Sequence, residues 1–204
     1  MSDEPPSGLA DERRTALLQA AVAVFARYGY RKASMDEVAR AAGLSRQGLY
    51  LHFPTKEALF REVVEWLLKR SLAAAQAALT DEARPLEERL VGAFDAMYGH
   101  YIESLGATPH LAELFETSAR LVGPLIKQQE CSFRGAVTDL LARAGLGRLW
   151  AGAGLSAHDL AETLEAVAYG LKHRIGSRAD YLLRIGRAVR LVCGPRPAEG
   201  PRRA

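Results

Sequence analysis

Two short helical segments joined through one glycine constrain the fold of this chain more than any other part of its sequence. The first covers residues 34–42 and the second covers residues 45–51, with Gly43 between them. Ser34 and Glu37 have the spacing of a capping box, in which the serine hydroxyl accepts from the Glu37 amide and the carboxylate reaches back. Glycine adopts the sharp turn between two such helices without steric cost. The segment therefore predicts a helical hairpin.

This hairpin needs a third helix, because two helices of this length are not stable alone in water. The preceding segment supplies one, since Ala21, Val24 and Phe25 recur at helical spacing. Gly29 follows them, and glycine commonly ends a helix in the left-handed conformation. We therefore expect a three-helix domain over residues 11–55.

The remainder of the chain also has helical periodicity, and no segment alternates in the manner of a β-strand. Pro124 predicts a kink or a delayed helix start within its segment. Residues 145–154 are rich in glycine and are expected to form a connection. The predicted fold class is therefore all-α, with about nine helices in total. The further helices are expected over residues 56–78, 84–104, 109–117, 118–144, 156–172 and 178–193.

Composition indicates a globular protein and argues against a membrane protein, a secreted protein and a disulfide-rich or metal-binding protein. Of the 204 residues, 49% are hydrophobic and 25% are charged, which is enough for a buried core. No apolar run approaches the 18 or so residues that a membrane span needs, and the first ten residues lack the pattern of a signal peptide. Cys131 and Cys193 do not have the spacing of a metal site or of a disulfide framework. We therefore expect a cytoplasmic protein with no membrane contact, no metal and no cofactor.

Residues 14–60 resemble the DNA-binding domain of the tetracycline-repressor (TetR) family. The most specific part is the pattern Tyr-x-His-Phe-x-x-Lys-Glu-x-Leu, which starts at Tyr50. The net charge of +3 contributes little to this interpretation, because residues 1–60 contain eight Lys or Arg and seven Asp or Glu. The family pattern is matched by Leu17, Ala20-Ala21, Val24-Phe25, Gly29-Tyr30, Ser34-Met35, Val38-Ala39, Ala42-Gly43-Leu44-Ser45, Leu49-Tyr50, His52-Phe53 and Lys56-Glu57-Ala58-Leu59-Phe60.

The resemblance implies that the helix over residues 45–51 enters the major groove of operator DNA. Arg46 and Gln47 are then expected to contact base edges, because arginine matches guanine O6 and N7 and glutamine matches adenine N6 and N7. Gly48 brings no side chain and allows close approach of the backbone. Three alternatives remain open: a phosphate clamp for Arg46, a core position for Tyr50, and a role as helix cap alone for Ser34. The expected contacts to the phosphate backbone, which position the protein without reading sequence, are Ser34, Tyr50, His52 and Lys56.

The resemblance also implies a homodimer and a small-molecule effector, with the last two helices pairing about a twofold axis. A mostly apolar pocket favours an apolar or aromatic effector. The candidate pocket residues are Trp66, Met97, Tyr98, His100, Tyr101, His110, Phe115, Cys131 and Phe133. The candidate interface residues are Leu160, Leu164, Val167, Gly170, Leu171, Tyr181, Leu182, Ile185 and Val189. For the last two helices, completion of the monomer core is the open alternative.

These expectations define four segments: a disordered arm over 1–10, a helix-turn-helix DNA-binding domain over 11–55, an effector-binding and dimerisation domain over 56–193, and a disordered tail over 194–204. The implied function is a sequence-specific transcriptional regulator, a repressor that an effector releases from a palindromic operator, with activation as a further option. An architectural or cell-division DNA-binding protein of the same fold is one alternative. A helical enzyme is the other, and no nucleophile triad, HExxH motif or phosphate-binding glycine loop supports it.

Overall fold

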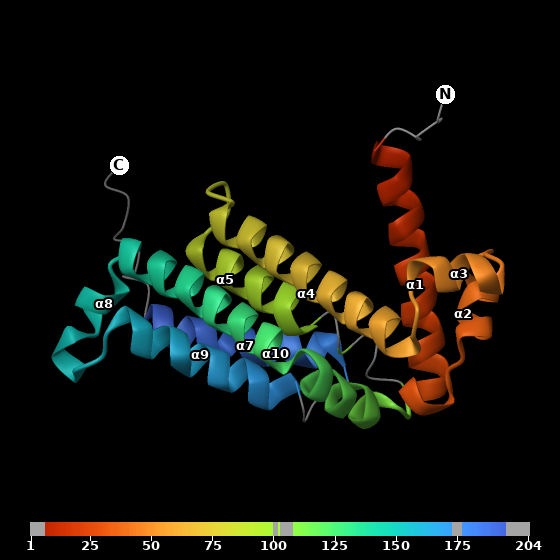
Figure 1. The fold of residues 1–204 in the computed structure, drawn as a ribbon. Coiled ribbons are helices and arrows are strands. Elements are labelled where there is room, and N and C mark those ends of the chain that lie inside the picture. The colour runs from red at the N-terminus through yellow and green to blue at the C-terminus, as the bar shows by residue number, and fades with distance from the viewer. Residues whose placement is uncertain (1–6, 100–101, 103–107, 173–176, 195–204) are drawn as a thin grey trace. The chain divides into compact units, whose positions relative to one another are not determined.

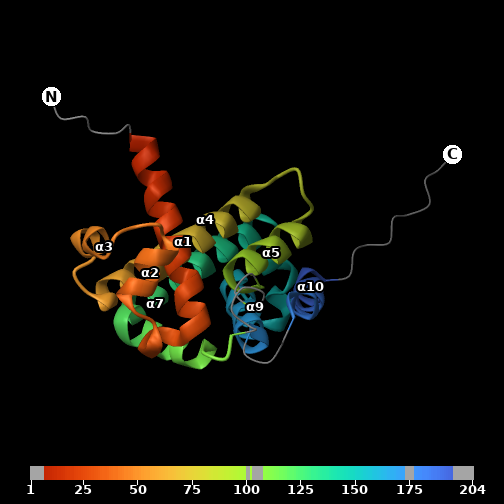
Figure 2. The same ribbon diagram turned by 90° about the vertical axis from the view of Figure 1, so that its right-hand side faces the viewer.

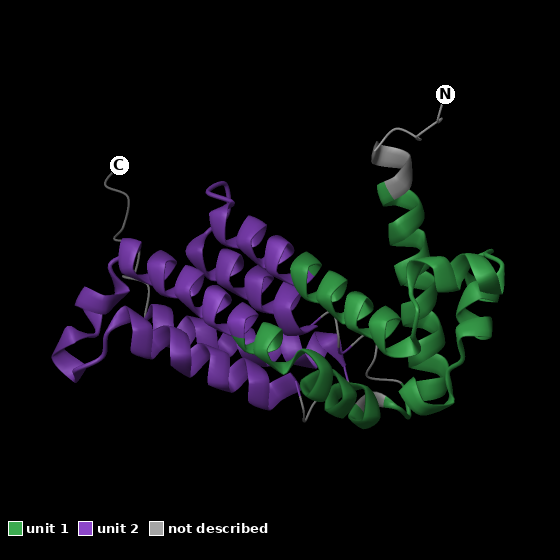
Figure 3. Cartoon of the chain, in the orientation of Figure 1, with its two compact units in different colours: residues 1–70, 108–127 green, residues 71–107, 128–204 purple. Residues whose placement is uncertain are grey.

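The computed structural model describes residues 7–99, 102, 108–172 and 177–194. The chain divides into two compact units (Figure 3): unit 1 comprises residues 1–70 and 108–127, and unit 2 comprises residues 71–107 and 128–204. Every regular element within the described residues is a helix, which confirms the all-α fold class (Figure 1). In those same ranges, no helix has both the length and the apolar character required to cross a lipid bilayer.

Unit 1 is built around three N-terminal helices: α1 (Ser7–Lys32), α2 (Met35–Ala41) and α3 (Arg46–His52). The first parts of α4 (Lys56–Thr80) and α7 (Leu111–Arg143) complete it. Helix α2 packs on α1 and α3 packs on α2, as Figure 2 shows. The helical hairpin expected around Gly43 is therefore present, with Gly43 in the left-handed region at a φ of 68°.

The core of unit 1 is formed by the apolar faces that the helical spacing predicts. Ala21 from α1, Ala39 from α2 and Leu49 from α3 are each almost completely buried. The two alanines allow close approach of the helices, because a methyl group is the smallest side chain that still excludes water from the crossing. The Phe60 ring of α4 packs edge-on against Phe25, with ring centroids 5.0 Å apart, a favoured aromatic geometry. The first helix thus covers the hairpin as expected.

Gly29 interrupts α1 with φ 75° and ψ 169°, a conformation that is essentially restricted to glycine. The segment that leads into α7 packs against this point: the Thr108 hydroxyl donates to the Ala26 carbonyl, and Glu113 Oε1 accepts from the Arg31 amide at 2.6 Å. A Cβ atom at position 29 would lie 2.6 Å from Glu113 Oε2. Glycine is therefore required here both for its backbone angles and for the space it leaves.

Unit 2 contains the second parts of α4 and α7 and all the remaining elements. Helix α10 packs against both α5 and α9 (Figure 1). The remaining elements are α5 (Leu86–Phe94), the π-helix η1 (Asp95–Gly99), α8 (Leu146–Leu149), the 3-10 helix η2 (Ala151–Ala153), α9 (Ala157–Lys172) and α10 (Arg178–Cys193).

Aromatic rings and two buried side-chain hydrogen bonds hold the core of unit 2 together. Phe94 and Phe133 are fully buried and pack edge-on with centroids 5.2 Å apart. The fully buried Tyr181 donates its hydroxyl to the Phe94 carbonyl at 3.2 Å, so that burial of this polar group is compensated. Trp150 donates its indole N–H to the Val192 carbonyl at 2.7 Å, which fastens the segment after α8 to the end of α10.

One bidentate ion pair joins the start of α10 to the π-helix. Arg178 Nε lies 2.8 Å from Asp95 Oδ1, and its Nη2 lies 2.6 Å from Asp95 Oδ2. The Asp95 side chain is only 18% exposed, so its charge depends on this guanidinium for compensation. Two parallel hydrogen bonds between planar groups also fix the relative orientation of the two elements.

Several predicted boundaries differ from the structure. Helix α1 begins at Ser7, earlier than residue 11, while the other residues of the expected arm and of the tail lie outside the described residues except Gly194. The two helices expected over 109–117 and 118–144 form one element, α7, with a kink at Val122. Pro124 causes this kink because it has no N–H for the carbonyl four residues earlier. The connection expected over 145–154 contains α8 and η2.

Candidate nucleic-acid interface

Helix α3 is anchored to unit 1 through one buried side chain and exposes most of its others. Ser45 caps it by accepting from the Gly48 amide at 3.0 Å, and Leu49 anchors it as a fully buried side chain. Residues two positions before and after Leu49 lie about 200° around the helix from it. Gln47 and Leu51 therefore project outward together, and both are exposed. This outward face, with the exposed Arg46, Tyr50 and His52 beside it, is accessible to another molecule.

Arg46 lies beside this face and is held by its own domain. Its Nη1 atom is 3.1 Å from Asp36 Oδ2 of α2, and its guanidinium carbon lies 5.6 Å from the centre of the Tyr50 ring. The pair is exposed, so the two charges attract each other only weakly in water. A nucleic acid could therefore displace Asp36 from Arg46 at little energetic cost.

Ser34 caps α2 through the complete capping box that the sequence predicts. Its hydroxyl oxygen accepts from the Glu37 amide at 3.2 Å, and its amide and hydroxyl both donate to Glu37 Oε2 at 2.8 Å. These hydrogen bonds hold the pKa of Glu37 below its usual value. The stabilisation is therefore present above the ordinary pKa of a glutamate and is lost as the pH falls through the lowered pKa. Glu37 is the anion at this helix start, so Ser34 acts first as a cap.

Lys56 binds backbone carbonyls within unit 1. Its Nζ atom donates to the Arg31 carbonyl at 3.1 Å and to the Ala33 carbonyl at 2.9 Å. It also lies 4.8 Å from the centre of the Tyr30 ring, a cation–π distance. These carbonyls end α1, where a cation is favoured by the helix dipole. Lys56 therefore binds backbone carbonyls of unit 1, and its expected contact with a DNA phosphate stays a prediction.

This arrangement gives a testable prediction for Lys56. Lys56→Met keeps the aliphatic stem and removes the charged donor, so we expect the free energy of unfolding of unit 1 to fall by about 1–2 kcal/mol. The measurement is urea denaturation followed by circular dichroism. Lys69→Met, an exposed lysine later in the same helix, is the matched control and should change stability little. Equal stability of the Lys56 and Lys69 variants would contradict the structural role of Lys56.

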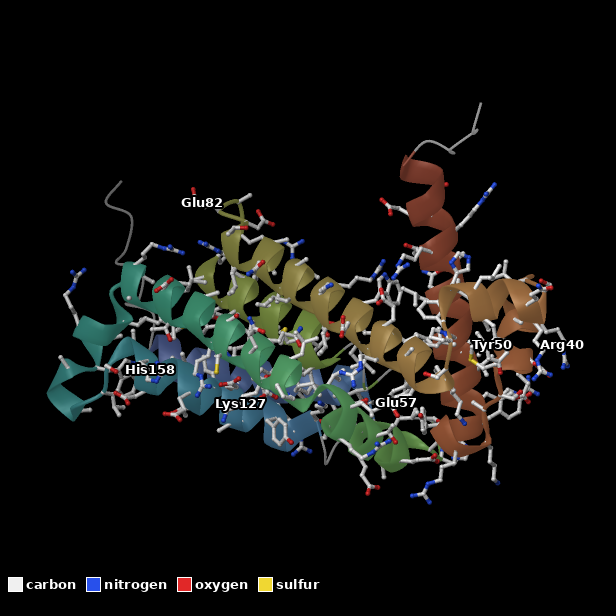
Figure 4. The ribbon with its side chains drawn as sticks, viewed as in Figure 1. Arg40, Tyr50, Glu57, Glu82, Lys127 and His158 are labelled. Atoms are coloured by element: carbon white, nitrogen blue, oxygen red, sulfur yellow. The ribbon has the colours of Figure 1, made fainter. Side chains whose placement is uncertain are left out.

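The other predicted contact residues lie on the surface as a DNA-contacting role requires. Tyr50 is 38% exposed and His52 is exposed at the end of α3, while Gly48 is half-buried. A Cβ at Gly48 would have Ser45 Oγ as its only neighbour within 4 Å among the atoms described. Figure 4 shows Tyr50 and Arg40 on the surface of unit 1, with Arg40 extending outward from α2. Position 48 therefore leaves a bare stretch of backbone on α3.

Sequence reasoning missed Leu51 and two arginines. Leu51 was interpreted only as the end of the helix, and its exposure of 81% follows from its position opposite Leu49. Arg27 and Arg40 line a groove of about 300 Å³ between α1 and α2. The helical wheel of α3 could have identified Leu51, whereas the groove depends on how α1 and α2 cross.

The structure divides the candidate effector residues between the two units. In unit 1, His110 lies beside Gly29 with its Nδ1 atom 3.8 Å from Glu113 Oε2, and Trp66 lies under the Arg70 guanidinium at 4.8 Å. Phe115 also belongs to unit 1. His100 and Tyr101 lie outside the described residues.

The candidates in unit 2 are Met97, Tyr98, Cys131 and Phe133. Met97, Tyr98 and Phe133 share its core, and the rings of the latter two lie 6.3 Å apart. Cys131 is exposed, with its sulfur 3.7 Å from an Arg134 nitrogen. Three of these four candidates are therefore close together and buried, while Cys131 faces outward.

The candidate dimer residues also separate into two groups. Val167 and Gly170 of α9 are exposed, and Leu171 and Leu182 are half-buried against the core of unit 2. A fully buried side chain has no surface to offer a second chain, so a contact through α9 and α10 must use exposed positions. Leu160, Leu164, Tyr181, Ile185 and Val189 are at most 4% exposed and complete the core of unit 2.

The geometry of α2, the Gly43 turn and α3 defines a helix-turn-helix domain. The sequence model of bacterial regulatory proteins of the tetR family matches residues 17–63, which confirms the resemblance of this domain to that family. The transcriptional activator FasR of Mycolicibacterium smegmatis is 39% identical over 88 residues, 42% of this chain and 40% of that protein. The transcriptional repressor KstR2 of Mycobacterium tuberculosis is 35% identical over 92 residues, 45% of this chain and 46% of that protein. These matches thus span less than half of either relative.

Solved structures resemble most of the chain, and this resemblance is one of fold. The TetR-family regulator PfmR of Thermus thermophilus has a TM-score of 0.58 and 18% identity, covering 85% of this chain and 96% of that one. A structure described as the molecular basis for control of antibiotic production by bacterial hormones has a TM-score of 0.64 and 27% identity, covering 89% and 96%. Most of the chain is thus similar in fold to TetR-family regulators, and the match to the family's sequence model lies in its N-terminal part.

Proposed function

We propose that this chain is a sequence-specific, DNA-binding transcriptional regulator of the cytoplasm. The observation that carries the proposal is the outward face of α3, where Gln47 and Leu51 project from a rigid, capped helix-turn-helix. A helix of this kind fits the major groove, in which each base pair presents a distinct pattern of donors and acceptors. The named relatives support regulation as the role, and one is an activator while another is a repressor.

The proposed DNA-binding species is a homodimer formed through α9 and α10. Exposed apolar side chains support this assignment: Val167 and Tyr169 on α9 are 36% and 49% exposed, and Leu183 and Leu191 on α10 are 51% and 76% exposed. Gly170 has open space around the position of a Cβ, which permits a second backbone to approach closely. A twofold dimer of this kind binds a palindromic site through two copies of α3.

The proposed effector site lies among Met97, Tyr98 and Phe133 in unit 2. Ionisable groups surround Tyr98: burial raises the pKa of Glu165 and lowers the pKa of Lys172, whose Nζ lies 5.7 Å from the Tyr98 ring centre. Glu165 pairs with Arg134 at 3.2 Å, so the surroundings of Tyr98 combine aromatic and apolar side chains with charged groups. We therefore propose an effector with an aromatic or apolar body and at least one polar group. It would act by preferring one conformation of the dimer over another.

The experiment that tests the function is selection of binding sites from a random duplex library. We expect the protein to enrich one palindromic sequence, and sedimentation should show two chains bound to each duplex. Enrichment of no sequence, with equal binding to all duplexes, would contradict sequence-specific regulation and favour an architectural role.

Gln47 gives a prediction for the selected duplex. Gln47→Ala should weaken binding to that duplex by about 1–3 kcal/mol per half-site, because the bidentate contact to adenine is lost. Binding to a scrambled duplex should change less than about twofold. Gln128→Ala, an exposed glutamine of unit 2, is the control, and fluorescence anisotropy is the measurement. An equal loss on both duplexes would contradict the role of Gln47 in reading sequence.

A further inference from the structure

Leu51 occupies an unusual position for an apolar side chain. At 81% exposure it is the most exposed large hydrophobic residue in the described part of the chain. Leu49, two residues earlier, is fully buried, so the local packing of α3 leaves Leu51 with no role in the core of unit 1. An isolated exposed leucine needs no explanation by itself. The position of Leu51 relative to Gln47 is what makes its exposure informative.

Leu51 and Gln47 are separated by four residues on α3 and therefore lie on the same helical face. Gly48 lies next to Gln47 and has no side chain. Position 48 therefore carries no side chain that could cover Leu51. The separation of four residues corresponds to about 6 Å along the helix, which is roughly two base-pair steps of 3.4 Å. In a major groove that receives Gln47, the Leu51 side chain would thus reach a base pair about two steps from the one that Gln47 contacts.

We infer that Leu51 is a specificity-determining residue that recognises the 5-methyl group of a thymine in the major groove. This inference rests on the proposed DNA-binding function. A leucine has no hydrogen-bond donor or acceptor, and thymine is the base that presents a methyl group in this groove. Opposite cytosine or guanine, the leucine would instead remove water from a polar group without replacing the hydrogen bond. Together with Gln47, the residue specifies two A·T pairs about two base-pair steps apart in each half-site.

The test uses the duplex that the protein selects from a random library. Each thymine is replaced in turn by uracil, which keeps the base pair and removes only the methyl group. We expect one thymine in each half-site, about two base pairs from the adenine that Gln47 contacts, to show about a fourfold loss of affinity when replaced. Replacement in both half-sites should give about a fifteenfold loss.

Leu51→Ala should abolish this sensitivity to uracil, because the variant has no side chain long enough to reach the methyl group. Gln47→Ala is the matched control on the same face, and it should keep the uracil effect while losing affinity for the adenine. Since Leu51 is exposed, thermal unfolding of Leu51→Ala should be unchanged.

The outcomes separate the inference from the function on which it rests. Selection of no duplex would contradict DNA-binding regulation itself. A selected duplex with no thymine near the Gln47 adenine, no uracil effect in the wild type, or the same uracil effect in Leu51→Ala would each overturn the role of Leu51 while leaving the function standing.

Discussion

Gly29→Ala is expected to lower the free energy of unfolding of unit 1 by about 3 kcal/mol. A φ of 75° with a ψ of 169° costs a non-glycine residue about 1–3 kcal/mol. The added Cβ would also lie 2.6 Å from Glu113 Oε2 and displace this carboxylate from the Arg31 amide. Loss of that charge-assisted hydrogen bond adds to the backbone strain. Urea denaturation monitored by circular dichroism measures the change.

Gly43→Ala is the matched control, because Gly43 also has a positive φ but no described atom within 4 Å of the added Cβ. It should cost about 1–2 kcal/mol from backbone strain alone. A double-mutant cycle with Glu113→Ala isolates the steric part, and the double variant should be less destabilised than the sum of the single variants. Additive effects in this cycle would show that Glu113 does not pack against Gly29.

Arg178→Ala is expected to destabilise unit 2 by about 3 kcal/mol. The substitution removes both hydrogen bonds to Asp95 and leaves a carboxylate that is only 18% exposed without its counter-charge. Scanning calorimetry measures the change, and a unit of this size loses about 4 °C in Tm for each kcal/mol. Arg178→Lys should fall between the wild type and the alanine variant, because lysine keeps the charge but not the planar fork.

Arg184→Ala provides the matched comparison on the same helix. Arg184 pairs with Asp180 at 3.1 Å, but both side chains are exposed, so its loss should cost about 0.5 kcal/mol or less. If the variants at positions 178 and 184 had the same Tm, the bidentate pair to Asp95 would have no special structural role.

The fold could be predicted wherever the determining interactions are local. The bounds of α2, α3 and α10 follow from caps and turns a few residues apart, and the predicted end of α10 at Cys193 is confirmed. No cap or turn motif in the sequence indicates the π-helix η1, because its residue Asp95 is held by Arg178, 83 residues later in the chain. Long-range contacts of this kind do not appear in periodicity.

In the candidate site too, the features that local interactions determine could be predicted, and those that depend on long-range contacts could not. Gln47 could be placed on the outer face of α3 from the helical period alone, because Leu49 must face inward. The partner of Lys56 could not be predicted in this way, since the Ala33 carbonyl that it binds lies 23 residues earlier in the chain. An apolar stripe such as that of α10 also has the same pattern whether it packs on its own core or on a second chain. Tyr181 illustrates this point, because it matched an interface pattern and lies in the core of unit 2.

In the proposed recognition of DNA by α3, Asp36 competes with the duplex for Arg46. Before any nucleic acid arrives, Arg46 already has an acceptor 3.1 Å away, and the contact it would make with guanine replaces one partner with another. The net gain is the difference between the two, and the exposed pair is worth about 0–1 kcal/mol. Because this pair is worth so little, Asp36 reduces only slightly the free energy that Arg46 would contribute to binding DNA, while it holds the guanidinium beside the outward face of α3.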